Sequence, residues 1–487
     1  MDIPKQVKSV IEKIEKNGFK AHIVGGCVRD FLRNEKPKDW DIATSAKPEQ
    51  IQKLFPKSFY KNKFFTVTIK TNSKDPELKE IEVTTYRFET KYTDKRHPEQ
   101  VKFAKTIEED LSRRDFTVNS IAIELEKKKT KIIDPFNGQK DLKNKTIKAV
   151  REAEKRFSED ALRMMRAVRF STVLGKNWKI EKNTSQAIKK NAIWLQAISK
   201  ERIRDELIKI IMSENAADGI ELLRKLELLK YIVPELEQGY KVAQNKHHIY
   251  ECYEHYIRSL DYAAKKDFGM HVRLASLFHD IGKPRSKRGK GEDATFYNHE
   301  IIGAKMTLQI LNRLKFSKKD VEKIAKLVRY HLFYYTPEEV GESSVRRLVR
   351  QVGPENMEEL LQVRMSDRIG SGVPKAEPYK LRHLKYVIEK VRQDPISVKM
   401  LKISGNNIME ILKIKPGPKI GQILDILLGY ILEEPKKNKK EFLEKEVNKL
   451  KKLNEKELLS LAQKSKEEIQ KIETKRDKMT KKKYWVT

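Results

Sequence analysis

Two aspartates separated by a single residue, Asp39 and Asp41, stand at the head of a short apolar run near the start of the chain. If this run is a strand, alternate residues share a face, so the two carboxylates lie side by side. Adjacent carboxylates repel each other unless cations or water offset their charge. Two divalent metal ions about 3.5–4 Å apart on such a pair can activate an attacking hydroxyl and stabilise a leaving group in phosphoryl transfer. An isolated Asp-x-Asp is more often a solvated pair at a strand edge, so a second feature must decide.

A glycine turn shortly before the aspartates supplies that second feature. The residues Ala21–Val24 form a strand pattern, a Gly-Gly turn follows directly, and a helical pattern begins after it. Paired glycines let the backbone approach a phosphate closely, and the N–H groups at a helix start favour an anion. Gly26 and Arg29 are therefore predicted to contact a triphosphate. Because Mg²⁺ prefers a few carboxylates together with phosphate oxygens, Asp39 and Asp41 are predicted to hold two Mg²⁺ ions.

These two motifs resemble the head of the class II tRNA nucleotidyltransferases, the group that contains CCA-adding enzymes and bacterial poly(A) polymerases. They read GGCVRD at 25–30 and DWDIAT at 39–44, and two further motifs follow in the family's order, RRDFTVNS at 113–120 and DPFNGQKDL at 134–142. The resemblance covers about residues 22–170. It implies that Asp39 and Asp41 are the catalytic metal ligands. It also implies that Arg114 contacts the phosphates or ribose of the incoming nucleotide.

Glu82 is a third candidate ligand for the metal ions. It lies in a β-branched run where related folds often present a third acidic side chain. In an alternating strand Glu80 and Glu82 share a face, and a solvent-facing role explains both equally well.

Charged residues recur at helical spacing after these motifs. Asp160, Arg163 and Arg166 are one turn apart, which predicts a single helix face, and Arg169 extends the row. An Asp accepts from the exocyclic amino group that cytosine and adenine share, while Arg donates to ring nitrogens or carbonyl oxygens. The match to the family's ED-x-x-R motif implies that Asp160 and Arg163 read the base. By the same resemblance, Arg166 and Arg169 contact phosphate or ribose. Without the upstream motifs, an Asp–Arg ion pair on a basic helix would explain the spacing.

The segment 87–98 is predicted to be a polar, mobile loop that is too long for a plain hairpin. In the family that the sequence resembles, a flexible loop here helps to change the site from C addition to A addition. Enzymes restricted to adding C are shortened in it. The loop therefore argues against a C-only enzyme but does not separate full CCA addition from A addition alone.

A second group of candidate metal ligands lies in the middle of the chain and resembles an HD domain. The resemblance implies that a divalent metal is held by His255, His279, Asp280 and Asp367, and two additional histidines, His299 and His331, match those of such domains. Imidazole and carboxylate together suit a transition metal, which can activate water for phosphoester hydrolysis. The family implies removal of phosphate, including cyclic phosphate, from damaged RNA ends. A helical scaffold with idle histidines is an equal alternative.

Composition limits the class of protein. The chain has 487 residues and a formal net charge of +34, which predicts several domains and a polyanionic partner such as nucleic acid. No apolar run approaches the ~20 residues needed to span a bilayer, so no membrane association is expected. Cys27 and Cys252 are too few for a disulfide framework, and the start of the chain lacks a secretory signal pattern, so a cytoplasmic location is expected.

The predicted fold class is α+β, with a polymerase beta-like nucleotidyltransferase head that contains a mixed sheet, followed by helical regions. We expect the head at 1–146, a helical neck and RNA-binding region at 147–238, the HD domain at 239–372 and a basic helical tail at 373–487. Beyond Pro435 the composition, rich in Lys and Glu, predicts a charged helix or partly disordered segment without a packed core.

The function predicted from these features is template-independent addition of CCA to the 3′ end of tRNA from CTP and ATP, with release of pyrophosphate. The helical regions are expected to hold the acceptor and T arms of the tRNA, and the oligomeric state stays open. The alternatives are an A-adding tRNA nucleotidyltransferase, a poly(A) polymerase, and an HD phosphohydrolase acting in addition on RNA ends. A non-enzymatic RNA-binding protein is opposed by the intact Asp39 and Asp41.

Overall fold

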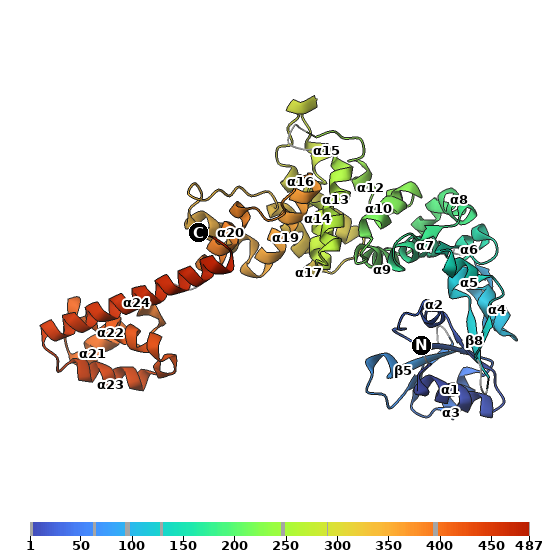
Figure 1. Cartoon of the computed structure of the whole chain (residues 1–487), viewed down its shortest axis with the longest axis horizontal. Coiled ribbons are helices and arrows are strands. Elements are labelled where there is room, and N and C mark those ends of the chain that lie inside the picture. The colour runs from blue at the N-terminus through green and yellow to red at the C-terminus, as the bar shows by residue number, and fades with distance from the viewer. Residues whose placement is uncertain are drawn as a thin grey trace. The chain divides into compact units, whose positions relative to one another are not determined.

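The computed structural model of the chain describes residues 3–61, 65–92, 98–126, 130–244, 249–289, 291–392 and 398–486. The chain divides into two compact units. The first contains Met1–Leu332 and Glu358–Ala376, and the second contains Phe333–Met357 and Glu377–Thr487. Figure 1 shows the elements of both in chain order.

The first unit begins with a seven-stranded sheet in the order β3-β4-β5-β2-β1-β8-β9. Its strands are β1 (Ala21–Val24), β2 (Asp41–Thr44), β3 (Ser58–Lys61), β4 (Thr66–Lys70), β5 (Glu80–Thr85), β8 (Ala122–Leu125) and β9 (Thr130–Ile133). β2 and β5 run parallel, whereas the other neighbouring strands are antiparallel. The predicted α+β class with a mixed sheet is confirmed.

Helices cover this sheet and complete its core. They are α1 (Lys5–Lys16), α2 (Gly26–Leu32), α3 (Pro48–Leu54), α4 (Ile107–Ser112) and α5 (Gly138–Lys143). α1 carries Val7, Ile11 and Ile14 at helical spacing, and these side chains are fully buried in one cluster with Ile23 and Ile42 of the strands. The apolar face of α1 thus covers one face of the sheet. The strand residues that point to this face must be apolar, and this restricts the register in which β1 and β2 can pair.

The segment predicted to be a mobile polar loop is instead the start of a β-hairpin, so that prediction was wrong. β6 (Arg87–Tyr92) and β7 (Pro98–Phe103) pair antiparallel as a separate two-stranded sheet. Its tip, residues 93–97, lies outside the described residues. The composition misled because a two-stranded sheet needs few apolar residues, whereas the alternation of Phe88 and Tyr92 with polar residues already had strand periodicity.

Helices follow the head through the rest of the first unit. The neck contains α6 (Ala153–Glu159), α7 (Leu162–Val173), α8 (Lys182–Asn191), α9 (Lys200–Ile211), α10 (Ala216–Lys225), α11 (Leu229–Ile232) and α12 (Pro234–Glu237), with a short parallel pair formed by β10 (Thr146–Ile147) and β11 (Lys179–Ile180). α7 packs against both α9 and α10. The next bundle contains α13 (Cys252–Lys265), α14 (Met270–Phe278), α15 (Lys283–Ser286), α16 (His299–Arg313), α17 (Lys318–Tyr330) and α19 (Met357–Gly370).

The second unit contains α18 (Glu342–Val352), α20 (Tyr379–Arg392), α21 (Gly405–Leu412), α22 (Pro418–Glu433), α23 (Lys440–Leu450) and α24 (Glu455–Lys483). In Figure 1 the helices α21 to α24 lie together. Leu443, Val447 and Leu450 of α23, with Leu458 and Ala462 of α24, are buried in one core with α21 and α22. The prediction that the chain lacks a packed core beyond Pro435 was therefore wrong. Its sparse apolar residues recur at one helix face, and the Lys and Glu residues occupy the other faces.

A buried arginine joins the neck to the bundle. Arg273 of α14 is 1% exposed, and its guanidinium donates to the carbonyl of Ile211, the last residue of α9, at 3.1 Å and to that of Ser213 at 2.9 Å. It also donates to the carbonyl of Phe268 and to the carboxylate of Asp267. These carbonyls end a helix and a turn, so without the guanidinium they would be buried and unpaired.

Arg273→Met should lower the free energy of unfolding of the first unit by about 3 kcal/mol, because several buried carbonyls lose their donor. Urea titration followed by circular dichroism measures the change. Arg285→Met is the matched control, since Arg285 is exposed and donates one hydrogen bond to Gln238; its effect should stay within about 0.5 kcal/mol. Equal midpoints for the two variants would contradict the assigned role of Arg273.

Candidate functional site

Three carboxylates converge at the end of β2. Asp41 is the first residue of that strand and lies opposite Glu82 in the parallel register with β5. Asp39 precedes the strand and is exposed, while the intervening Trp40 is buried and anchors the segment. The expectation that Asp39 and Asp41 alternate within one strand was therefore wrong, because β2 begins only at Asp41. The acids nevertheless come together from two different parts of the chain.

The electrostatics of the three acids favour a cation. Burial, followed by the negative charge of Asp39, raises the pKa of Asp41 to about 7, with a smaller contribution from Glu82. The guanidinium of Arg114 opposes this shift. A divalent cation between these acids would offset both the burial and the repulsion that raise the pKa of Asp41. The set Asp39, Asp41 and Glu82 thus fits a divalent cation.

Gly25 allows the backbone to approach these acids. Its φ is +83°, and a Cβ there would lie 3.1 Å from Nη1 of Arg114 and 3.3 Å from Oδ2 of Asp41. At Gly26 a Cβ would meet the nearest atom, of Arg29, at 3.6 Å, an ordinary contact. The sequence prediction named Gly26, but Gly25 is the position that requires glycine. A positive φ cannot be recognised from a Gly-Gly pair alone.

Arg114 is oriented by a buried acid that the sequence prediction missed. Asp110 of α4 is 1% exposed and pairs with Arg113 at 2.8 Å and with Arg114 at 3.3 Å. Burial opposes the charge of Asp110, but the two guanidiniums outweigh it and lower its pKa. Asp110 therefore stays ionised and holds Arg114 beside Gly25. The helical spacing of 110 and 114 was the available signal.

Arg29 faces the 113–120 motif. Its Nη1 donates to Oδ1 of Asn119 at 2.9 Å, and its other donors bind the carboxylate of Asp30. Its guanidinium also lies over the ring of Phe170 on α7, 5.4 Å from the centroid. Arg29 thus ties the glycine turn to the motif and to the neck, and its contact with a triphosphate remains a prediction.

Asp160 and Arg163 have different partners from those expected. Asp160 lies in extended conformation between α6 and α7, where its carboxylate accepts from the N–H of Leu162, so it is not on the helix face of Arg163. Its carboxylate pairs with Arg202 of α9 at 2.7 Å, whereas Arg163 pairs with Glu159 at 2.7 Å. The predicted single row was wrong because the helix breaks at Asp160. Their ion pair, the alternative explanation, does not form either.

Arg166 and Arg169 do share a face of α7. Arg166 Nε donates to Asp115 of the head at 2.7 Å, and Arg169 pairs with Glu206 of α9 at 3.2 Å. Asp115 is buried, yet the guanidinium of Arg166 outweighs burial and lowers the pKa of Asp115 to about 2. The two arginines join head, α7 and α9 through charge-assisted bonds. Their predicted contacts with phosphate or ribose stay predictions.

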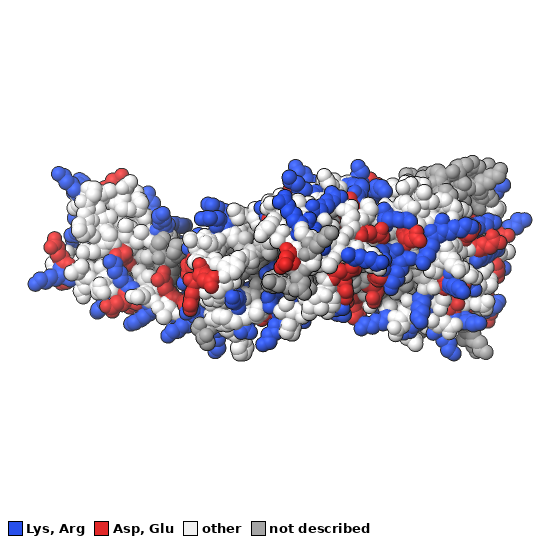
Figure 2. Space-filling view, turned by 90° about the horizontal axis from the view of Figure 1, so that it is seen from above, with Lys and Arg blue, Asp and Glu red and all other residues white. Residues whose placement is uncertain are grey.

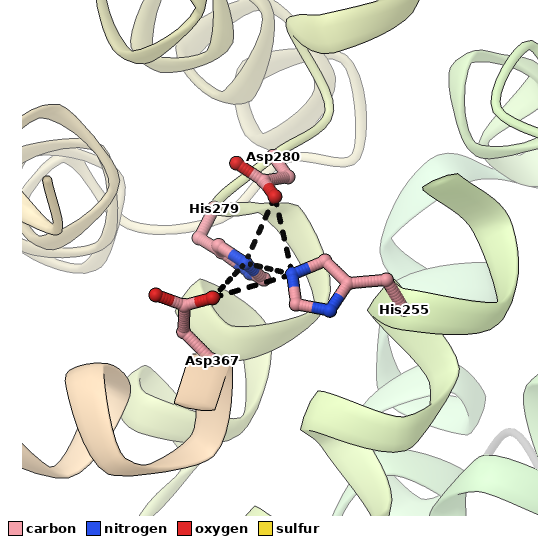
Figure 3. Close-up of side chains that lie close together, drawn as sticks. All are labelled: His255, His279, Asp280 and Asp367. Carbon is pink, nitrogen blue, oxygen red and sulfur yellow. Dashed lines mark hydrogen bonds and ion pairs between the residues drawn. The ribbon is translucent and has the colours of Figure 1, made fainter. Parts of the chain in front are cut away.

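The four residues predicted to bind a metal in the bundle come together (Figure 3). His255 and His279 direct their Nε2 atoms at each other at 2.8 Å, and Oδ2 of Asp280 lies 3.1 and 3.3 Å from these two nitrogens. Oδ1 of Asp367 lies 3.4 and 3.5 Å from the same nitrogens. The four ligand atoms lie within 4.8 Å of one another, and all four residues are buried. This donor set fits one divalent transition metal.

Asp280 links this set to a second one. Its other oxygen, Oδ1, lies 3.2 Å from Nε2 of His299 and 3.5 Å from Nε2 of His331. These three residues form a second group able to hold an ion. Burial opposes a proton on His279, but the carboxylates of Asp280 and Asp367 outweigh it and raise its pKa to about 10. The buried acids therefore attract positive charge strongly, and a metal would compete with that proton.

Comparison with known proteins agrees with this arrangement. Three family models match: the poly A polymerase head domain over residues 21–148, the probable RNA and SrmB-binding site of polymerase A over 177–239, and the HD domain over 252–369. The start of the first unit is thus similar to the poly A polymerase head domain. The resemblance to nucleotidyltransferases with an HD domain, predicted from the sequence, is confirmed. The range matched by the head model includes Asp39, Asp41 and Glu82, and the range matched by the HD model includes both groups of candidate metal ligands.

Individual relatives are CCA-adding enzymes. The CCA-adding enzyme of Ligilactobacillus salivarius is 44% identical over 234 residues, which are 47% of this chain and 55% of that enzyme. The CCA-adding enzyme of Listeria innocua is 44% identical over 224 residues, which are 46% of this chain and 54% of that enzyme. The chain thus spans about half the length of the curated relatives it matches. The structure of the Bacillus stearothermophilus CCA-adding enzyme with CTP has a TM-score of 0.59 and 27% identity, covering 92% of this chain and 98% of that one. The Thermotoga maritima CCA-adding enzyme with tRNA shares the fold at 20% identity and a TM-score of 0.54, covering 91% and 95%.

Gly25→Ala should weaken binding of CTP with Mg²⁺ about tenfold, because the new methyl group displaces Arg114 or Asp41. Gly18→Ala is the matched control: Gly18 has φ +84°, and its added Cβ would meet nothing within 4 Å. Both substitutions place a side chain at a positive φ, which costs about 1 kcal/mol or more, so calorimetric titration of the two variants compares a strained site with and without the added contact. Equal affinities in the two variants would rule out the close approach at Gly25.

Proposed function

We propose that the chain adds CCA to the 3′ end of tRNA without a nucleic acid template, using CTP and ATP and releasing pyrophosphate. The observation that carries this proposal is the register that sets Asp41 opposite Glu82, beside Gly25 and Arg114. Carboxylates around a close backbone turn, next to an oriented guanidinium, suit the transfer of a nucleotidyl group. The similarity to CCA-adding enzymes supports the same reaction.

The residues of the chain divide the work. Two Mg²⁺ ions bound by Asp39, Asp41 and Glu82 would supply the positive charge that nucleotidyl transfer needs at the reacting phosphate. Arg114, held by Asp110, is placed to pair with phosphate oxygens. The turn at Gly25 leaves room for the triphosphate.

Asp160 and Arg163 are proposed to read the Watson–Crick edge of the base. In the free protein Arg202 and Glu159 pair with them, and both partners are ionised groups at hydrogen-bond distance. An incoming cytosine or adenine must therefore replace or share these partners. Pairing in advance keeps both side chains oriented, and it disfavours a base that offers the wrong donors, because a half-buried charge would then lose its partner.

The partner is proposed to be tRNA, held through its acceptor and T arms. Lys and Arg side chains outnumber acidic ones over the surface in Figure 2, as the formal net charge of +34 requires. Contacts of this kind with phosphate make affinity strongly dependent on salt. Within the described ranges, no helix is long and apolar enough to cross a membrane. Cys27 and Cys252 are buried and free, which agrees with a reducing location such as the cytoplasm.

The product of the reaction tests this proposal against its closest alternatives. A tRNA transcript lacking CCA, incubated with CTP and ATP, should gain two C residues and one A residue, resolved by denaturing gel. Long A tails would identify a poly(A) polymerase instead. An enzyme that adds only A would extend transcripts ending in CC and leave shorter ends unchanged.

Asp41→Ala should lower the rate of nucleotide addition by about a thousandfold or more, because the metal ions lose a shared ligand. Binding of tRNA, measured by filter retention, should stay nearly unchanged. Asp75→Ala is the control, since Asp75 is a half-exposed acid of the same head, whose carboxylate pairs with Lys36 and accepts from the N–H of Glu77. Retained activity in Asp41→Ala would refute the assigned metal role.

A second function, hydrolysis of phosphate from RNA ends by the HD domain, is favoured by one observation. The ligand atoms of His255, His279, Asp280 and Asp367 converge, and Asp280 continues the set toward two more histidines. Burying carboxylates and imidazoles together is costly unless a bound cation compensates their charge, so a purely structural role does not explain this cluster. The reaction would leave the free 3′ hydroxyl that the head requires.

Asp280→Asn should reduce the transition metal bound by the purified protein to near zero, because Asp280 contributes to both ligand groups. Elemental analysis measures the metal, and phosphate release from an RNA ending in a 2′,3′-cyclic or 3′-phosphate measures the reaction. Asp261→Asn on α13 is the control, as Asp261 is a surface residue paired with Lys265. Nucleotide addition should be unaffected in both variants. Unchanged metal content in Asp280→Asn would exclude this metal centre.

A further inference from the structure

A pocket opens onto the metal-ligand groups of the HD domain. It encloses about 790 Å³ and is lined at one side by Asp280, His299, His331 and Asp367. A volume of this order holds a ligand of nucleotide size, whereas inorganic phosphate alone would fill only a small part of it. The other residues that line the pocket should therefore contact the rest of the ligand.

Two arginines of α19 lie in that wall, one helical turn apart. Nη1 of Arg364 lies 2.7 Å from Oδ2 of Asp367, and the opposite oxygen of the same carboxylate, Oδ1, faces His255 and His279. Nε of Arg368 donates to the carbonyl of Lys375 at 3.3 Å. Both guanidiniums line the pocket. Two like charges at this spacing repel each other, so an anion between them is stabilised, and a guanidinium pair matches the oxygens of a phosphate.

An aromatic side chain stands at the mouth of the same pocket. Tyr297 lines it and is 74% exposed, although it lies between the buried Phe296 and the start of α16. The following residue, Asn298, has φ +60°, so the backbone turns sharply here before the helix. A large exposed ring held by such a turn offers a flat face to a nucleobase, since stacking on an aromatic side chain is worth about 1–3 kcal/mol per base.

We propose that this pocket binds the phosphorylated terminal nucleoside of an RNA, with Arg364 and Arg368 on the phosphate and Tyr297 against the base. The inference rests on the proposed phosphohydrolase function of the HD domain. In that reaction water adds to phosphorus, the bond between phosphorus and the ribose oxygen breaks, and the oxygen takes a proton to become the 3′ hydroxyl. Arg364 also positions Asp367, because it binds the oxygen that faces away from the histidines.

Binding and hydrolysis are measured on the full chain with three ligands: adenosine 3′-phosphate, glycerol 2-phosphate, and a short RNA ending in a 3′-phosphate. Arg368→Gln should weaken calorimetric binding of all three about tenfold or more. Tyr297→Ala should weaken the adenosine and RNA ligands about tenfold and leave glycerol 2-phosphate unchanged. The head also binds nucleotides, but it is the same in every variant, so differences between titrations report on the HD pocket.

Arg285→Gln and Leu308→Ala are the controls, as both residues are exposed, lie in the same bundle and are outside the pocket lining. Equal effects of Tyr297→Ala on all three ligands, or none on any, would overturn the assignment of the base, and unchanged binding in Arg368→Gln would overturn that of the phosphate. A preference for the RNA over adenosine 3′-phosphate supports an RNA end, whereas the reverse order identifies a free nucleotide and overturns the RNA assignment. Binding differences without hydrolysis by the wild-type protein would reject the phosphohydrolase function while keeping the pocket.

Discussion

Repulsion between carboxylates at the end of β2 is the constraint around which the head is arranged. Asp41 and Glu82 meet because β2 and β5 are the parallel pair of an otherwise antiparallel sheet, and Asp39 joins them from the segment before the strand. The fold holds these acids together through burial of α1 on the sheet, whose apolar contacts offset a local electrostatic cost. Burial and the neighbouring charge of Asp39 both act on Asp41 and raise its pKa to about 7.

Ion pairs between buried acids and arginines orient side chains in both the head and the neck. Asp110 orients Arg114, Asp115 binds Arg166, and Glu206 binds Arg169. Each of these three arginines is therefore paired with a buried acid. Breaking one such pair leaves an uncompensated charge, which is costlier than the pair is stabilising. The acids therefore restrict where the guanidiniums can point, and the head and α7 are locked in one arrangement within the first unit.

Motifs with strict local spacing were predictable from the sequence, and contacts across the chain were not. The strand, glycine turn and helix at 21–32 follow from residue order and type, whereas the ligands of the HD domain were predicted from the resemblance to that family. The partner of Asp160, in contrast, is Arg202, which no spacing rule connects to it, and the break before α7 depends on the backbone at Asp160. The core of α23 and α24 was not predicted because this segment is rich in Lys and Glu. The helical periodicity of Leu443, Val447 and Leu450, which form part of that core, does not depend on the overall composition.

The two metal sites differ in how their acids are satisfied, and this difference has consequences for what each binds. In the head, the three acids lie close together with one guanidinium nearby, so the proposed magnesium ions would take oxygens of a nucleotide to complete their shells. In the HD domain, Asp367 already meets two imidazoles and Asp280 meets four, and Asp280 also meets Lys283 at 2.6 Å. That set supplies imidazole nitrogens and carboxylate oxygens from the protein itself, so a transition metal bound there would keep its ligands between turnovers. On this proposal the head would depend on its substrate for its ions, whereas the HD domain would depend on its own side chains.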